Sequence, residues 1–155
     1  MSKGIFSFFD PLREKYNQLS GTVRTLIEIG ISALLALSTL FIWSNVEVEL
    51  FTNPIRIGLE VPSGILTAIS AIVAIVFTFM PRFTKFRFIP FFGAFVVSLF
   101  FQFNIGAIGI SSCFGLVLSL IISFLGGIWF FLLDFYPSLG SADDSEPAPK
   151  PPVQK

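Results

Sequence analysis

The stretch FIPFFGAFVVSLFFQFNIGAIGISSCFGLVLSLIISFLGGIWFFLL, residues 88–133, contains no charged side chain, and it decides the class of fold. One crossing of a bilayer needs about 20 apolar residues, so this stretch can supply two membrane-spanning helices. The spans are expected at residues 88–103 and 110–133. The turn between them is expected around the polar and small residues Gln102, Asn104, Gly106 and Gly109.

Two stretches upstream have the same character. Residues 25–43 contain one charge, Glu28, and residues 62–80 contain none. The chain of 155 residues is 54% apolar and 13% charged, whereas a soluble domain carries about 25% charged residues. We therefore expect an all-α integral membrane protein with four transmembrane helices. The first span exceeds the apolar core of about 7–15 residues in a signal peptide, so it should remain as an anchor.

The basic residues predict which way the chain faces, because Lys and Arg collect in cytoplasmic segments. With both ends cytoplasmic, nine of the ten basic residues share that side, and Arg56 alone lies outside. The nine are Lys3, Arg13, Lys15, Arg24, Arg82, Lys85, Arg87, Lys150 and Lys155. Residues 81–87 then form a basic cytoplasmic loop, and the Pro-rich residues 134–155 a disordered cytoplasmic tail. A bacterial plasma membrane is expected, with a thylakoid or organellar membrane as the alternative.

Residues 1–24 have the pattern of a cytoplasmic amphipathic segment. Asp10 is a suitable N-cap, and Pro11 suits the first position of a helix. Leu12, Tyr16 and Leu19 then share one face, which predicts a helix lying on the membrane surface. The alternative is a loop whose apolar patch is covered by the rest of the protein.

Residues 44–61 alternate between apolar and polar side chains on either side of a turn at Asn53-Pro54. This period of two predicts a short β-hairpin in the first exported loop. The charged positions of this hairpin are Glu47, Glu49, Arg56 and Glu60. Its carboxylates either bind a cation outside the membrane or form the solvated face of the hairpin.

Small residues recur at every fourth position near the end of the chain: Ser111, Gly115, Ser119, Ser123 and Gly127. We call them the small-residue ridge. Small residues four apart let two helix backbones come close together, which favours association in lipid. The ridge therefore predicts a helix-packing surface, facing either another span of the same chain or another protein.

The residue types exclude several kinds of chemistry. The chain has no histidine and one cysteine, Cys113, so it cannot assemble the usual zinc, copper or haem ligand sets or a His-activated nucleophile. We expect no enzymatic activity. The polar residues in or beside the spans lie near their ends, where caps and interface groups are expected: Arg24, Glu28, Gln102 and Asn104. Arg24 and Glu28 are four apart, so a local ion pair is predicted.

The ligand predictions are few. The net charge is zero, so no nucleic-acid partner is expected. No cofactor is expected, although the Phe-rich span 88–103 could hold a lipid, quinone, carotenoid or chlorin. The more common role of such phenylalanines is contact with lipid. The expected partners are other membrane-protein subunits and lipids.

One segment resembles a known family. Residues 40–77, LFIWSNVEVELFTNPIRIGLEVPSGILTAISAIVAIVF, resemble the lipopolysaccharide assembly protein A domain of bacterial inner membranes. The shared features are Asn45 after an aromatic-ended span, the alternation up to Phe51, and Val61-Pro62 before a span rich in small residues. The resemblance implies a hairpin that joins two spans and a role in regulating envelope lipid synthesis through protein contacts.

Together these patterns predict a non-catalytic accessory or scaffolding subunit of a larger membrane complex, acting through helix packing. Three alternatives remain at this stage. They are a small homo-oligomeric transporter or channel, a lipid- or pigment-binding protein, and a regulatory adaptor in envelope lipid assembly.

Overall fold

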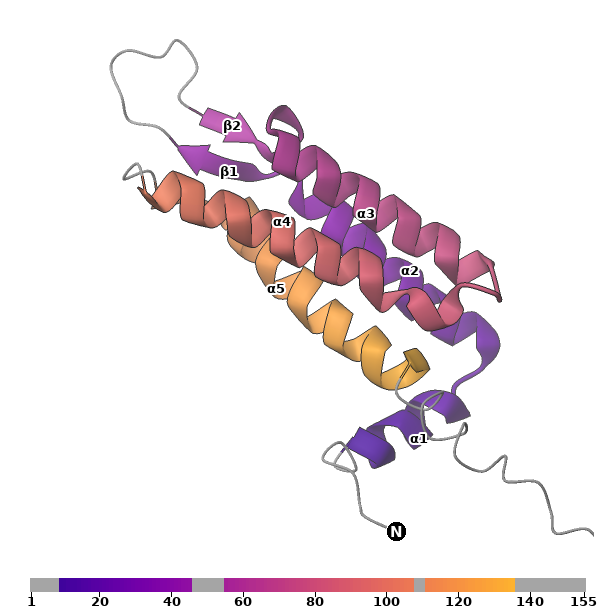
Figure 1. The fold of residues 1–155 in the computed structure, drawn as a ribbon. Helices are drawn as coiled ribbons and strands as arrows, with labels where there is room; N and C mark the ends of the chain where they lie inside the picture. Colours follow the sequence, from indigo (N-terminus) through magenta and orange to yellow (C-terminus); the bar gives the residue numbers. More distant parts are fainter. Residues whose placement is uncertain (1–8, 46–54, 108–110, 136–155) are drawn as a thin grey trace, which may run out of the picture.

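The computed structural model describes residues 9–45, 55–107 and 111–135 (Figure 1). The chain begins with the short helix α1 (Asp10–Gln18) and continues into α2 (Gly21–Ser38). The later long helices are α3 (Pro62–Phe79), α4 (Phe88–Ala107) and α5 (Phe114–Phe130). The short elements are β1 (Ile42–Asn45), β2 (Ile55–Ile57), β3 (Ser111–Ser112), the 3-10 turns η2 (Gly58–Glu60) and η3 (Thr84–Phe86), and the π-helical turn η4 (Phe131–Phe135).

Four helical segments are long and apolar enough to cross a membrane, which confirms the expectation of four such helices. They cover Gly21–Ser38, Pro62–Phe79, Thr84–Gly106 and Phe114–Phe135. Each packs against the next in the chain, and contacts between α2 and α5 close the bundle. The bundle has an α1 end, where α1 and the end of α5 lie, and a sheet end, where β1 and β2 lie (Figure 1).

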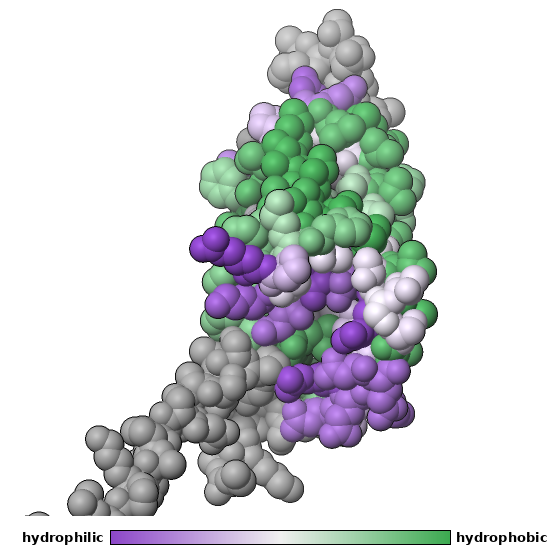
Figure 2. Space-filling view, turned by 90° about the vertical axis from the view of Figure 1, so that its right-hand side faces the viewer, coloured by the Kyte–Doolittle hydropathy of each residue, from purple (hydrophilic) through white to green (hydrophobic). Residues whose placement is uncertain are grey.

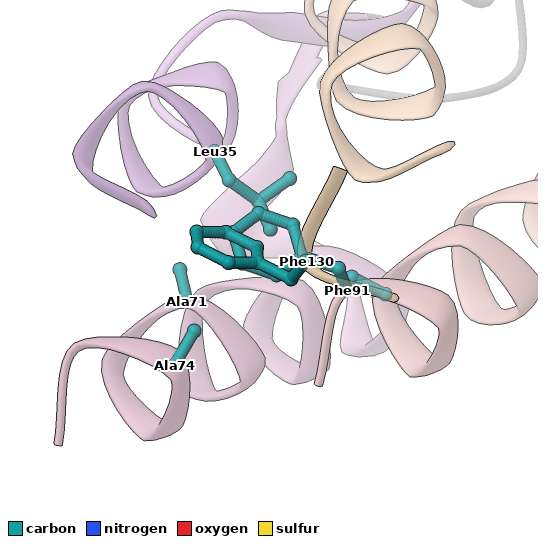
Figure 3. Packing of buried hydrophobic residues seen from close by; sticks show 6 residues of the cluster. Leu35, Ala71, Ala74, Phe91 and Phe130 are labelled. Carbon is teal, nitrogen blue, oxygen red and sulfur yellow. The ribbon is translucent and has the colours of Figure 1, made fainter. Parts of the chain in front are cut away.

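The core of the bundle receives side chains from all four helices. Leu35 of α2, Ala71 and Ala74 of α3, Phe91 of α4 and Phe130 of α5 meet in one buried cluster (Figure 3). The Phe91 and Phe130 rings lie 5.1 Å apart between centroids. The alanines of α3 leave room for these rings, so the small residues of the second span serve close packing within the bundle.

The outer surface of the bundle is apolar. Side chains such as Leu26, Ile72 and Val96 are more than half exposed, as expected for helices that face lipid. Figure 2 shows apolar side chains over the upper part of the face in view and hydrophilic side chains gathering toward the α1 end. This distribution agrees with a bundle whose helices can span a membrane.

The first long helix ends earlier than expected. The first span was expected over residues 25–43, but α2 ends at Ser38, and Trp43 lies on β1. Its side chain is fully buried, and its indole Nε1 donates a hydrogen bond to the carbonyl of Ser38 at 2.9 Å. Gly58 and Gly115 make room for it, because a Cβ on either would lie within 2.8 Å of the indole. Trp43 is therefore a core residue.

The small sheet differs in part from the predicted hairpin. β1 pairs antiparallel with β2, with Ser44 opposite Arg56, as the alternation around the turn suggested. However, β1 begins at Ile42 and also pairs with β3, with Ser44 opposite Ser112. The order β2-β1-β3 ties the first loop to the start of α5. Glu47 and Glu49 lie outside the described residues.

A Trp43→Phe variant should be less stable than wild type by about 1–2 kcal/mol, because the Ser38 carbonyl loses its indole donor and the smaller ring leaves space. Thermal unfolding in detergent measures this. Trp129→Phe is the matched control, because the buried Nε1 of Trp129 has no hydrogen-bond partner among the described residues. Equal losses for the two variants would contradict the role given to Trp43.

Candidate functional site

A cluster of ionised side chains lies inside the α1 end of the bundle. Arg87, directly before α4, is only 5% exposed. Its Nη1 forms an ion pair with Glu28 of α2. Its Nε and Nη2 each donate a hydrogen bond of 3.0 Å to Asp134 of η4, one to each carboxylate oxygen. With Tyr16 of α1, these residues form what we call the ionic cluster.

Local structure aims the Arg87 side chain into this cluster. The turn η3 brings the Thr84 carbonyl within 3.2 Å of Arg87 Nε, which donates to it. The guanidinium lies over the Phe130 ring, with Cζ 5.0 Å from the ring centroid. The flat fork of arginine suits both contacts, because it can pair with a carboxylate through two bonds and stack on an aromatic face. Lysine could not reproduce this arrangement.

Tyr16 connects the short helix α1 to the cluster. Its hydroxyl donates a 2.8 Å hydrogen bond to Glu28, and its ring meets the Trp129 ring edge to face at 5.4 Å. Burial, followed by the hydrogen bond to Glu28, raises the pKa of Tyr16 well above its usual range. The hydroxyl therefore stays protonated and remains a donor at ordinary pH.

A Tyr16→Phe variant should be less stable than wild type by about 1–2 kcal/mol at neutral pH, because Glu28 loses a donor. The folded protein raises the pKa of Tyr16 above the value of about 10 in an unfolded chain. The advantage of wild type should thus be constant below about pH 10 and decrease as the pH rises further.

Thermal midpoints of the two proteins at several pH values measure this difference. Asn17→Ala is the control, because Asn17 is an exposed neighbour on the same helix. A difference between wild type and Tyr16→Phe that keeps its size well above pH 10 would argue against the protonated hydroxyl as its source.

The cluster corrects several sequence-based expectations. Glu28 does not pair with Arg24, since the ion pairs of the described residues join Arg87 to Glu28 and to Asp134. The Nε of Arg24 is buried without a hydrogen-bond partner. Arg87 is not a solvated charge of the predicted loop 81–87, and Asp134 is not part of a disordered tail. The remaining tail residues, 136–155, lie outside the described residues.

The sequence did contain a signal for this pairing. Asp134 is the first acidic residue after Glu60, and it directly follows the long uncharged stretch. Arg87 directly precedes the same stretch. When two antiparallel spans follow one another, the residue before the first and the residue after the second lie on the same side of the membrane. The two opposite charges could therefore have been predicted to lie close together.

The small-residue ridge packs against other elements of the same chain. Gly115, Ser119, Ser123 and Gly127 are all buried. A Cβ on Gly115 would meet β1, and one on Gly127 would meet Phe92 of α4 at 3.2 Å. Ser111, by contrast, belongs to β3 and not to a helix. The ridge is thus covered by β1 and α4, so it offers no open seat for a helix of another protein.

Hydroxyl groups bond one another across the middle of the bundle. Ser98 lies 3.1 Å from Ser119 and 3.3 Å from Thr67, oxygen to oxygen, which joins α3, α4 and α5. All three side chains are fully buried. Interhelical hydrogen bonds of this kind are worth about 0.6 kcal/mol each in membrane proteins. In the part of the chain described, these hydroxyls link helices and line no open pore.

The other candidate polar residues lie at the sheet end, away from the ionic cluster. Gln102 is half-buried, and Asn104 is exposed and donates to the Phe100 carbonyl at 2.7 Å. Glu60 accepts a hydrogen bond from the Ile57 amide, and Arg56 is exposed. The predicted turn at Gln102, Asn104 and Gly106 is therefore wrong, because all three residues lie within α4, where Asn104 bonds back to the preceding turn of the helix.

Three phenylalanines of the Phe-rich span pack against α5 or the core. Phe91 lies in the core, Phe92 faces Gly127, and the Phe95 ring lies 5.2 Å from that of Phe124. Two apolar cavities lie along α5, next to α1 and α2. Among the described residues, no group of three or more His, Cys, Asp or Glu could hold a metal ion.

These features define a small four-helix protein whose helices can each cross a membrane and whose buried ion pairs close one end. Comparisons with known proteins found no matching family, no matching curated protein and no matching solved structure. The resemblance of residues 40–77 to the lipopolysaccharide assembly protein A domain therefore stays a prediction.

Proposed function

We propose that the protein is a non-catalytic accessory subunit of a larger membrane-protein assembly. The proposal rests on one observation: buried polar side chains of the described residues bond to one another and link the helices. The ionic cluster joins α1, α2 and η4 to Arg87 at the start of α4, and the hydroxyls of Thr67, Ser98 and Ser119 join α3, α4 and α5. Polar groups employed in this way hold a bundle in one shape, and a bundle of fixed shape is suited to binding through its outer faces.

We further propose that the α1 end faces the cytoplasm. The basic residues Arg13, Lys15, Arg82 and Lys85 lie in α1 or in the connection between α3 and α4, whereas Arg56 lies in the sheet. The rule that Lys and Arg collect on the cytoplasmic side supports this orientation, with both chain ends inside and the sheet exported. A bacterial plasma membrane is the proposed location.

Isolation from the native membrane tests the accessory role. Photo-reactive residues replace Leu59 and Phe114 at the sheet end, Leu26 on α2 and Ile72 on α3, all of them exposed in the isolated chain. An assembly predicts migration at a large size in mild detergent and a cross-link from some positions to one defined protein, with the other positions silent. A monomer or small homo-oligomer without a partner would contradict the proposal. Flux assays of Glu28→Gln and Gln102→Ala in liposomes would then test the transporter alternative.

A further inference from the structure

Two apolar cavities lie next to each other along the last turns of α5. One, of about 230 Å³, lies between α5 and α1, and the other, of about 290 Å³, between α5 and α2. Leu125 and Trp129 line both cavities, so the two are adjacent at these side chains. We call the combined hollow the α5 groove.

The α5 groove has the length of one membrane leaflet. Its lining residues along α5 and η4 run from Ile121 to Leu133, about 18 Å at the rise of an α-helix. The hydrocarbon of one leaflet is about half of the 30 Å core of a bilayer. The groove therefore extends from the α1 end toward the middle of the bundle, which suits an acyl chain.

The charged residues that line the groove all belong to α1. Asp10 and Arg13 line the first cavity, whereas the second is lined by Ile31, Leu34, Ile121 and Ile122 with Gly126 and the two shared residues. No ion pair of Asp10 or Arg13 occurs among the described residues, so both charges are available to a ligand.

We propose that the α5 groove binds a zwitterionic phospholipid with a primary ammonium headgroup, phosphatidylethanolamine. The phosphate pairs with Arg13 and the ammonium with Asp10, while an acyl chain lies between α5, α1 and α2. Any apolar groove in a membrane fills with hydrocarbon, so the specific content of the proposal is the headgroup preference. It does not depend on the accessory role proposed above.

Native mass spectrometry of the full chain in detergent tests this site, with phosphatidylethanolamine, phosphatidylglycerol and phosphatidylcholine added at equal concentration. Wild type should retain about five times more phosphatidylethanolamine than phosphatidylglycerol. This is the effect expected of one partly exposed charge contact, here between Asp10 and the ammonium group. Asp10→Asn should abolish this preference, and Arg13→Gln should lower retention of all three lipids. Ile128→Trp should fill the groove and lower retention, whereas Ile72→Trp on α3, the control, should not.

Three results would overturn the proposal. The first is equal retention of the lipids by wild type, or a preference that Asp10→Asn leaves unchanged. The second is a protein dimer that Ile128→Trp abolishes, because the occupant would then be a second copy of the chain. The third is increased lipid retention in a Phe6→Ser/Phe8→Ser variant, because the occupant would then be the chain's own first residues.

Discussion

Replacing Arg87 with methionine should lower the free energy of unfolding by about 3–5 kcal/mol, the usual cost of breaking a buried ion pair on one side. The substitution leaves Glu28 and Asp134 buried without their shared cation. It also removes both hydrogen bonds to Asp134 and the contact with the Phe130 ring. Thermal unfolding in a mild detergent, followed by intrinsic tryptophan fluorescence, measures the loss.

Two comparisons separate lost pairing from other effects of the Arg87 substitution. Arg82→Met removes an exposed positive charge from the same connection and should leave the midpoint almost unchanged. Adding Glu28→Gln and Asp134→Asn to Arg87→Met removes the orphaned carboxylates and should recover part of the stability. If Arg87→Met and Arg82→Met unfold at the same temperature, the cluster contributes nothing to the fold.

A Gly64→Ala variant should lose about 3 kcal/mol or fail to accumulate, because a side chain there overpacks a backbone contact. A Cβ on Gly64 would lie 1.9 Å from the carbonyl oxygen of Gly58. The obstacle is backbone, so no side-chain rotation can relieve it. Gly58 in turn lies against Trp43 and the Thr39 backbone. The start of α3 would have to move away from the sheet end.

Gly93→Ala is the matched control for this substitution. Gly93 also lies in a long helix, but nothing approaches the position of its Cβ within 4 Å. Alanine should therefore be neutral there, or stabilising by up to about 1 kcal/mol through its higher helix propensity. Yield and thermal midpoint of the two variants can be compared side by side. Similar behaviour would mean that the contact between Gly58 and Gly64 does not limit the fold.

The long helices could be predicted because length and hydropathy decide them locally. Residues 62–80 were predicted as one apolar span that ends at Met80-Pro81, and α3 covers Pro62–Phe79. The first span was placed too late because Trp43 is aromatic and follows an apolar run. An indole at the membrane interface and an indole that points from a strand into the core have the same local sequence, and the packing of Trp43 against Gly58 and Gly115 distinguishes them.

The site was harder to predict because its members are far apart in the chain. Glu28 was recognised, but its expected partner was Arg24, four residues away, since local spacing favours neighbours on one helix. The true partner is Arg87, which also holds Asp134 across 47 positions. The small-residue ridge was found from its spacing alone. Spacing could not decide that β1 and α4 cover it, because that depends on how the bundle closes.

The members of the ionic cluster are far apart in the sequence, so they are synthesised at different times. Synthesis runs from the N-terminus, so Glu28 emerges first, Arg87 follows, and Asp134 comes at the end of the last described helix. A nascent chain thus holds its buried guanidinium with one carboxylate until the final span is inserted. A chain that stops before Asp134 leaves the Arg87 guanidinium paired with Glu28 alone, and a buried charge that has lost a partner destabilises a fold.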